Sequence, residues 1–256
     1  MKAEMKEKAR RLGFKTIVAN WSEYEGQEWL EPLLLAEEKE RDQNSLERRI
    51  REAHIGQFNP MSKFDWDWPE TIDREHVEEL FSLDFLKEVA NVVLVGSNGL
   101  GKSMIAQNLA YQSLMNGYST RFVKASQMLE ELTIFDGSIS RRRCLQKYCK
   151  PKLLVIDEVG YMNYDNRFAD LLYEVISGRY QKSSTIVTTN KGFTEWGAIF
   201  PSAGCVVTLV DRLLHKAETV VIEGNSYRHK EALERAEAKA AARKTKRKNK
   251  KEQQPC

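Results

Sequence analysis

The segment that most constrains the fold is VVLVGSNGLGKS, residues 92–103. Apolar, mostly β-branched residues enter a glycine-rich turn, and the turn ends on Lys102 and Ser103. The spacing GxxxxGK[ST] is that of a phosphate-binding loop, which needs a strand before it and a helix after it. A tight structural turn is the alternative. The segment favours a parallel sheet whose strands alternate with helices.

The glycines of this loop allow consecutive backbone N–H groups to surround phosphate oxygens at the start of a helix. Lys102 is predicted to neutralise the β- and γ-phosphates, and the Ser103 hydroxyl to ligate Mg²⁺. We therefore expect a nucleoside triphosphate to be bound by the whole loop: Gly96, Ser97, Asn98, Gly99, Leu100, Gly101, Lys102 and Ser103.

Short apolar segments and helical patterns alternate after residue 90. The predicted strands are 92–95, 120–124, 153–156, 185–188 and 219–222. The predicted helices are 102–116, 126–133, 166–180 and 208–215. Strands that are apolar on both faces are typical of a buried parallel sheet, so the pattern predicts an α/β fold.

The segment LLVIDEVGY, residues 153–161, ends an apolar strand in two acids. Asp157 should emerge at the carboxyl edge of the sheet, beside the phosphate loop, where Mg²⁺ would lie. Glu158 can polarise a water molecule for attack on the γ-phosphate, which a kinase acting on a small molecule would not need. Simple capping of a helix is the alternative, and the preceding phosphate loop favours the catalytic interpretation.

Three further polar residues follow the acidic pair. Asn190 ends the next predicted strand and could hold the attacking water beside Glu158, or it could be an ordinary turn residue. Arg212 lies on an amphipathic helix and Arg228 follows the last strand. An arginine on the γ-phosphate stabilises negative charge in the transition state. Spacing alone does not distinguish such an arginine from a surface salt bridge.

The chain is expected to have four parts: 1–57, 58–70, 71–230 and 231–256. The first reads as helical, either as a module or as an extension packed on the main domain. The second is a connector with Phe64, Trp66 and Trp68, whose rings either dock the connector or stack on a base, and docking is favoured. The last is a basic tail, predicted to be helical and then disordered.

The net charge of +3 conceals an uneven distribution, because residues 239–251 contain eight Lys or Arg and no acid. Such a tail binds nucleic acid or merely solubilises the chain. A second basic segment, SISRRRCLQKYCK at 138–150, is a DNA-binding candidate or a solvated loop. Our candidates for DNA phosphate contacts are Lys124, Arg141, Arg142, Arg143, Lys147 and Lys150.

The four cysteines have no metal-type spacing and are too few for a disulfide scaffold. No apolar run approaches the ~20 residues that span a bilayer, and the charged N-terminus lacks the apolar stretch of a secretion signal. We expect a cytoplasmic protein with reduced thiols and no membrane association.

Together these residues resemble an AAA+ ATPase, and more closely the IstB-like transposition helpers, which are relatives of the DnaC-type helicase loaders. The resemblance covers about residues 50–230. Its motifs, in the family's order and spacing, are GSNGLGKS, LLVIDEVGY, RYQKSSTIVTTNKGFTEWGAIF, VDRLLHKA and EGNSYR. The run TTNKGFTEWG followed by DRLLH is much more specific than a phosphate loop.

The resemblance implies an αβα sandwich with a five-stranded parallel sheet, a truncated lid and a small N-terminal helical domain. ATP would be the nucleotide and Asn190 the first sensor of its γ-phosphate. Arg212 resembles the finger that reaches a neighbouring subunit's nucleotide, and Arg228 resembles the second sensor, which acts in cis. Only 28 residues follow Arg228, and they are too charged to form the usual helical lid.

The function implied by the resemblance is a switch used in transposition. ATP-bound copies would form a homo-oligomer on double-stranded DNA, with ATP at the subunit interfaces, and would recruit the cognate transposase of an insertion sequence. Hydrolysis would then release or remodel the complex. The segment 138–150 lies where this group carries its DNA-contacting insertion, and the protein would associate with the nucleoid when bound to DNA.

Two other functions use the same residues. A DnaC-type helicase loader has the same ATPase core and differs in what its N-terminal module binds. One branch of loaders carries a cysteine-rich zinc module there, whereas residues 1–60 of this chain contain no cysteine. A nucleotide-sensing DNA scaffold would bind ATP and DNA, and its hydrolysis would be incidental.

Overall fold

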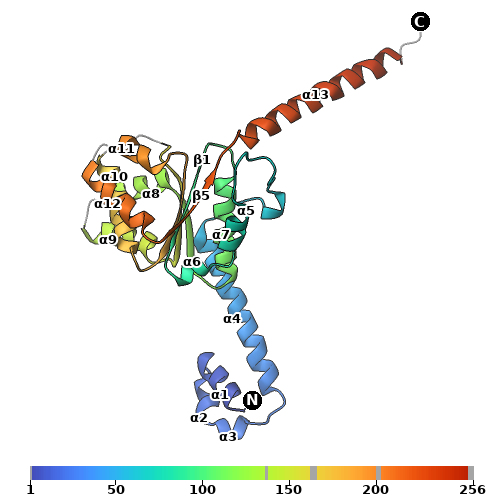
Figure 1. The fold of residues 1–256 in the computed structure, drawn as a ribbon. Helices are drawn as coiled ribbons and strands as arrows, with labels where there is room; N and C mark the ends of the chain where they lie inside the picture. The colour runs from blue at the N-terminus through green and yellow to red at the C-terminus, as the bar shows by residue number, and fades with distance from the viewer. Residues whose placement is uncertain (1, 136–137, 162–165, 200–202, 253–256) are drawn as a thin grey trace. The chain divides into compact units, whose positions relative to one another are not determined.

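The computed structural model of the 256-residue chain describes residues 2–135, 138–161, 166–199 and 203–252. Figure 1 shows the fold. The chain divides into two compact units, Met1–Glu52 and Ala53–Cys256. Each unit has a hydrophobic cluster of its own, and each is described by itself below.

The first unit is helical. It consists of α1 (Lys2–Arg11), α2 (Lys15–Ala19), α3 (Trp21–Tyr24) and most of α4 (Leu30–Ala53). Its small core is formed by Ala9, Leu12, Trp21, Leu30 and Leu34. Lys8 and Arg11 of α1 both pair with Glu38, which fixes α1 against α4. Few apolar side chains are buried here, as expected of a unit of this size.

The second unit is built on a five-stranded sheet in the order β2-β3-β4-β1-β5. Its strands are β1 (Asn91–Gly96), β2 (Thr120–Lys124), β3 (Leu153–Val159), β4 (Ser184–Thr189) and β5 (Ala217–Ile222). Every neighbouring pair is parallel. All five predicted strands fall within these bounds, so the predicted α/β class and strand number are confirmed.

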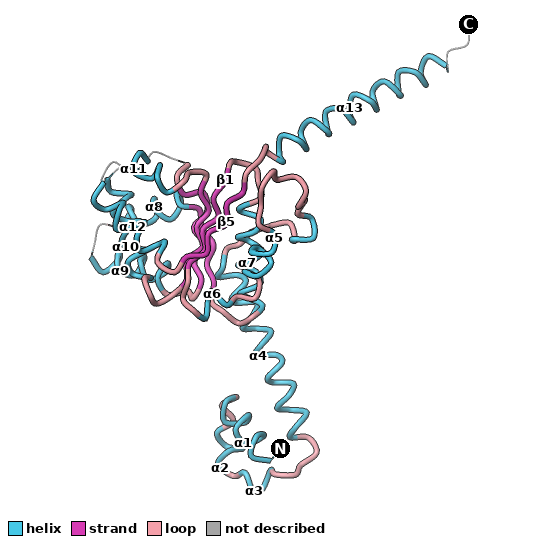
Figure 2. Tube along the Cα trace, in the orientation of Figure 1, coloured by secondary structure: helices cyan, strands magenta, loops and turns pink. Residues whose placement is uncertain are grey.

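Helices cover both faces of the sheet (Figures 1 and 2). One face carries α5 (Arg74–Leu80), α6 (Asp84–Lys87) and α7 (Lys102–Met115). The other carries α8 (Ala125–Ile134), α9 (Ser138–Cys149), α10 (Asn166–Arg179), α11 (Trp196–Ile199) and α12 (Ala203–Leu214). Alternate residues of β3 explain both layers, because Leu153 and Val155 enter one cluster and Leu154 and Ile156 the other.

Two segments differ from the sequence-based expectations. Residues 138–149 form helix α9 rather than a solvated loop, because Cys144 and Tyr148, four residues apart, both enter the core. Helix α12 begins at Ala203, earlier than the predicted 208. Its first turn consists of small apolar residues, and the signal that the sequence analysis did not use is Ser202, a residue type common at helix N-termini.

After β5 the described chain contains one more element, α13 (Tyr227–Glu252). This helix includes residues 231–252 of the basic tail, and residues 253–256 lie outside the described residues. Two short 3₁₀ helices complete the unit, η1 (Met61–Lys63) and η2 (Phe193–Glu195). Among the described helices, none is long and apolar enough to cross a membrane.

Candidate nucleotide-binding site

The loop between β1 and α7 has the backbone that a phosphate-binding loop requires. Gly101 has a φ of +88°, and a Cβ atom there would come within 2.4 Å of the Phe64 ring. Gly99 has a φ of +81°, and a Cβ atom there would meet Ser226 Oγ at 2.2 Å. Only glycine accommodates both the left-handed conformation and these close neighbours. The predicted loop therefore lies at the N-terminus of α7.

Lys102 points into this loop and is almost completely buried. Its Nζ donates to the carbonyl oxygens of Gly96 (2.6 Å) and Ser97 (2.7 Å). Burial lowers the pKa of Lys102 to about 8, while Asp157 acts against this shift and Arg228 adds to it. A buried ammonium that no carboxylate of the described residues contacts directly is well suited to bind phosphate oxygens.

Asp157 lies at the carboxyl end of β3 and is 4% exposed. Its Oδ1 accepts hydrogen bonds from Ser103 Oγ (2.8 Å) and Thr188 Oγ1 (2.5 Å). Thus the two predicted Mg²⁺ ligands, Ser103 and Asp157, are adjacent. The described residues contain no cluster of three or more metal-ligating side chains. The donor set fits Mg²⁺, which binds few protein oxygens and takes its other ligands from phosphates and water.

Glu158 occupies a β-bulge in β3. The register pairs Ile156 with Val187 and Val159 with Thr189, so Asp157 and Glu158 together face Thr188. Glu158 has a φ of +64°, a strained conformation for a residue with a side chain. Its backbone N–H donates to Thr188 Oγ1 at 2.9 Å. The bulge redirects the side chain of Glu158, which lines the cavity over the phosphate loop.

The Glu158 carboxylate also pairs with Lys124. Lys124 ends β2, and its Nζ lies 2.8 Å from Glu158 Oε2. The two strand ends are neighbours because Lys124 is in register with Asp157. The residue proposed from sequence as a DNA contact therefore contacts the proposed catalytic base.

A cavity of about 650 Å³ opens over the phosphate loop. The connector forms one wall through Phe64 and Trp68. Asn108 of α7 fixes the connector, since its side chain donates to Asn59 O (2.8 Å) and accepts from Met61 N (3.2 Å). Trp68 Nε1 donates to Asn225 O at 2.7 Å. Phe64 and Trp66 pack against the core cluster and Trp68 is held by Asn225, so the expected docking is confirmed for all three rings, of which Phe64 and Trp68 line the cavity.

Arg228 lies in the same cavity, on the first turn of α13. The start of this helix is anchored to the phosphate loop, because Tyr227 N donates to Gly99 O at 3.0 Å. Arg228 is also close enough to affect the pKa of Lys102. The structure thus brings Arg228 to the phosphate loop of its own chain.

Asn190 follows β4, which lies between β3 and β1 in the sheet. It therefore emerges at the same edge as the acidic pair and the phosphate loop. Its Oδ1 is buried and has no hydrogen-bond partner among the described residues. Buried polar atoms are nearly always paired, so this acceptor can take a hydrogen bond from a molecule bound at the same edge.

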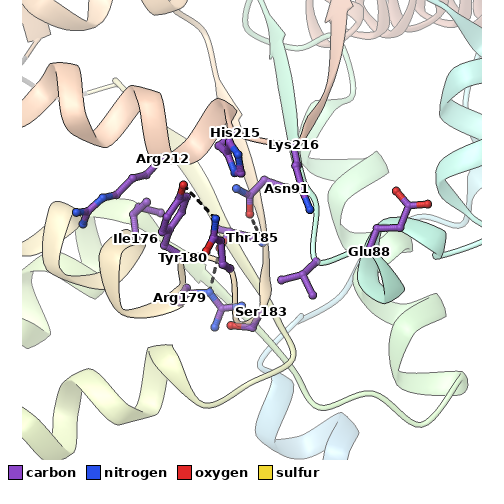
Figure 3. A pocket seen from close by; sticks show the side chains of 12 residues that line it. Glu88, Asn91, Ile176, Arg179, Tyr180, Ser183, Thr185, Arg212, His215 and Lys216 are labelled. Atoms are coloured by element: carbon purple, nitrogen blue, oxygen red, sulfur yellow. Dashed lines mark hydrogen bonds between the residues drawn. The ribbon is translucent and has the colours of Figure 1, made fainter.

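Arg212 is placed elsewhere, at the amino edge of the sheet. It belongs to the last turn of α12, just before β5 begins. It lines a second cavity, of about 340 Å³, together with residues at the starts of β1 and β4 (Figure 3). The length of a strand, roughly 20 Å for six residues, separates Arg212 from the phosphate loop of its own chain.

The remaining DNA-contact candidates lie on α9 or immediately after it. Arg141 pairs with Glu174 at 2.7 Å, and Lys147 pairs with Glu131. Arg142, Arg143 and Lys150 are exposed, and none has an ion-pair partner within the described ranges. The five basic residues thus divide into two that are neutralised by acids and three that present free positive charge.

Sequence reasoning overlooked Thr188. Its hydroxyl donates to Asp157 and accepts from the backbone of Glu158, and so it fixes both acids relative to β4. The available signal was a threonine near the carboxyl end of a completely buried strand, at the edge of the sheet where the acidic pair also emerges. Tyr161 and Tyr227, which also line the cavity, carried no comparable signal.

The family model of IstB-like ATP-binding proteins matches residues 4–235. The putative ATP-binding protein of insertion sequence IS5376 from Geobacillus stearothermophilus is 30% identical over 90% of this chain and 96% of its own length. The putative ATP-binding protein of insertion sequence IS21 from Pseudomonas aeruginosa is 33% identical over 75% of this chain and 72% of its own length.

Among solved structures, the crystal structure of DnaI is similar, with a TM-score of 0.55 and 17% identity, over 66% of this chain and 92% of that chain. At this identity the likeness concerns the fold, which is that of an AAA+ P-loop NTPase. The family model matches nearly the whole chain, and the phosphate loop, the acidic strand end and the cavity lie in one place, so this chain belongs to the family of IstB-like ATP-binding proteins.

Proposed function

We propose that this protein is an ATP-dependent helper of transposition. Its copies bind ATP with Mg²⁺, assemble on double-stranded DNA with the nucleotide at the subunit interfaces, and recruit the cognate transposase. Hydrolysis of ATP to ADP and phosphate then releases the assembly. The relatives are ATP-binding proteins of insertion sequences, which supports the link to transposition.

The observation that carries the proposal is the separation of Arg212 from the phosphate loop of its own chain. The other catalytic candidates, Lys102, Asp157, Glu158, Asn190 and Arg228, lie at or near one edge of the sheet. Arg212 lies at the other edge. An arginine that completes the site must then come from a second copy, and assembly and hydrolysis become one linked equilibrium.

The roles of the residues follow from their contacts. Lys102 binds phosphate oxygens from inside the loop, and Ser103 and Asp157 hold the cation. Glu158 Oε1 or Oε2 accepts a proton from the attacking water, which Asn190 orients through its unpaired amide oxygen. Bound Mg²⁺ neutralises charge that develops on the phosphates. Arg228 contributes positive charge in cis, and Arg212 does so in trans.

Changing Glu158 to Gln tests whether hydrolysis drives release. The amide keeps the size of the side chain but cannot accept a proton, so we expect kcat to fall by about 10²- to 10⁴-fold while ATP still binds. Filter binding should show complexes with DNA that persist in ATP. If the variant instead supports transposition at the normal rate, the protein is a nucleotide-sensing scaffold whose turnover is incidental.

The proposed DNA surface is the exposed side of α9. Replacing Arg142 and Arg143 with Ala removes two unpaired positive charges, so the slope of log K against log salt should become shallower by roughly 2. Arg141→Ala should have a smaller effect because Glu174 already neutralises that residue. Lys87→Ala, on the other face of the sheet, is the control. An unchanged slope in the double variant would refute this surface.

A helicase loader is the second candidate, favoured only by the fold shared with DnaI. The two functions differ in the protein partner. Tagged protein, with ATP and DNA present, should retain the transposase encoded by the same insertion sequence. Retention of the replicative helicase without the transposase would decide for the loader.

A further inference from the structure

The guanidinium of Arg212 is held entirely by neutral groups within the described part of the chain. Its Cζ lies 4.9 Å from the centroid of the Tyr173 ring and 5.7 Å from that of Tyr180. Its Nη1 donates to Ser177 Oγ. No carboxylate of a described residue pairs with it.

All three partners belong to one face of α10 and its C-terminal end. Tyr173 and Ser177 are one turn apart on the helix, and Tyr180 follows its last residue. Helix α12 packs on this face, because Leu209 and Leu213 share a cluster with Val175 and Ile176. The ring of His215 lies 5.6 Å from that of Tyr180 (Figure 3 shows both beside Arg212). The contacts of Arg212 are therefore part of a packed helix pair.

Neutral partners have a definite consequence for an arginine. A ring under the guanidinium fixes its plane and side-chain conformation, which lowers the entropy lost when an anion binds. A carboxylate would fix it equally well but would neutralise its charge and compete with phosphate. The serine hydroxyl accepts a hydrogen bond from one of the five N–H groups of the guanidinium. Neither ring accepts a conventional hydrogen bond from the others.

We propose that Tyr173, Ser177 and Tyr180 are positioning residues that hold Arg212 in a fixed orientation, with its charge not neutralised by an acid, for the phosphates bound by a neighbouring copy. This inference rests on the proposed function, because it requires Arg212 to act in trans. Beyond the proposed function, the inference makes two claims. The residues that hold Arg212 act in the same copy that donates it, and Tyr173 acts through its ring rather than through its hydroxyl.

The experiment mixes two full-length variants with DNA and ATP. Glu158→Gln copies bind ATP without hydrolysing it and keep Arg212, whereas Arg212→Ala copies keep a complete loop and acidic pair. Hydrolysis in the mixture reports donation of the arginine across the interface. Tyr173→Leu is then added to one variant at a time. In the Glu158→Gln copies it should lower kcat by about fivefold, equivalent to one cation–π contact, with KM for ATP unchanged.

Three results have distinct meanings. If Tyr173→Leu acts only in the donating copies, and Tyr173→Phe there restores the rate, the positioning role is supported. If the mixture hydrolyses ATP but Tyr173→Leu acts equally in both copies or in neither, the positioning role is refuted and the proposed function stands. If the mixture shows no hydrolysis, donation in trans fails and the proposed function fails with it. The conservative Phe variant separates a positioning effect from a loss of folding.

Discussion

The two edges of the sheet carry opposite kinds of polar network. At the carboxyl edge, Ser103 and Thr188 both donate hydrogen bonds to Asp157, and Glu158 pairs with Lys124. At the amino edge, Arg179 and Arg212 line one cavity without any carboxylate in contact with either guanidinium among the described residues. The first edge combines acids with cations for one site, while at the second neither guanidinium has a carboxylate partner among the described residues, although Glu88 lines the same cavity.

The two arginines of the amino edge differ from each other as well. Arg179 is 1% exposed and donates to Thr185 Oγ1 (2.9 Å), Tyr148 O (2.7 Å) and Pro151 O (2.9 Å). Figure 3 shows it turned inward toward Thr185. Arg212 is partly exposed and uses one hydroxyl. An arginine saturated by backbone carbonyls stabilises the fold, whereas one with spare donors can bind an anion.

The largest expected effect is that of Arg212→Ala. If the carboxyl edge is completed by Arg212 of another copy, kcat in the presence of DNA should fall by about 10³-fold or more. Unfolding temperature should hardly change, because the residue is partly exposed. The measurement is steady-state hydrolysis at protein concentrations above and below assembly.

Arg235→Ala is a matched control, since Arg235 lines the cavity at the carboxyl edge of its own chain and is mostly exposed. Its effect should be far smaller. Full hydrolysis by the Arg212 variant, or by an isolated wild-type copy without DNA, would break the comparison between the two edges.

Sequence predicted the carboxyl edge well because its signals are local. The loop of residues 96–103, the acids after the apolar strand at 153–156 and Asn190 after 185–188 each follow a strand. In a parallel sheet the carboxyl ends of strands meet at one edge. The position of each residue directly after a strand is therefore enough to predict that they lie close together.

The amino edge was not predictable in the same way. The contacts of Arg212 with Tyr173 and Tyr180 depend on how α12 packs on α10. These residues are more than 30 positions apart in the sequence, so no local pattern predicts that they meet. The pairing of Lys124 with Glu158 likewise depends on strand order. Helix α9 was missed as a helix because its exposed face is dominated by arginine, and its buried side is marked only by a few residues, among them Cys144, Leu145 and Tyr148.

Arg179→Met tests the structural half of the amino edge. The substitution keeps much of the volume but leaves the carbonyls of Tyr148 and Pro151 without their buried donor. Leaving a buried acceptor without its donor costs about 1 to 3 kcal/mol, so the two carbonyls together should lower the free energy of unfolding by roughly 2 to 6 kcal/mol, measured by urea denaturation. Hydrolysis by the remaining folded protein should be close to normal. A variant of normal stability that had lost hydrolysis would mean that Arg179, too, is functional.

The smallest expected effect concerns the charge of Lys102 at the carboxyl edge. Burial lowers the pKa of this ammonium to about 8 in the free protein. Triphosphate favours the charged form and raises that pKa, so binding takes up a proton wherever the free amine is neutral. ATP affinity should therefore be full below pH 8 and fall by at most about tenfold between pH 7 and pH 9.

Fluorescent ATP analogue titrations at several pH values measure this dependence. Lys102→Arg is the matched control, because a guanidinium remains charged throughout the range and its affinity should be independent of pH. A wild-type affinity that is flat to pH 9 would show that the loop keeps the ammonium charged. In that case the effect of the acids at the carboxyl edge on the pKa of Lys102, that of Asp157 above all, outweighs the effect of burial. The carboxyl edge would then differ even more from the amino edge, where no acid contacts Arg179 or Arg212 among the described residues.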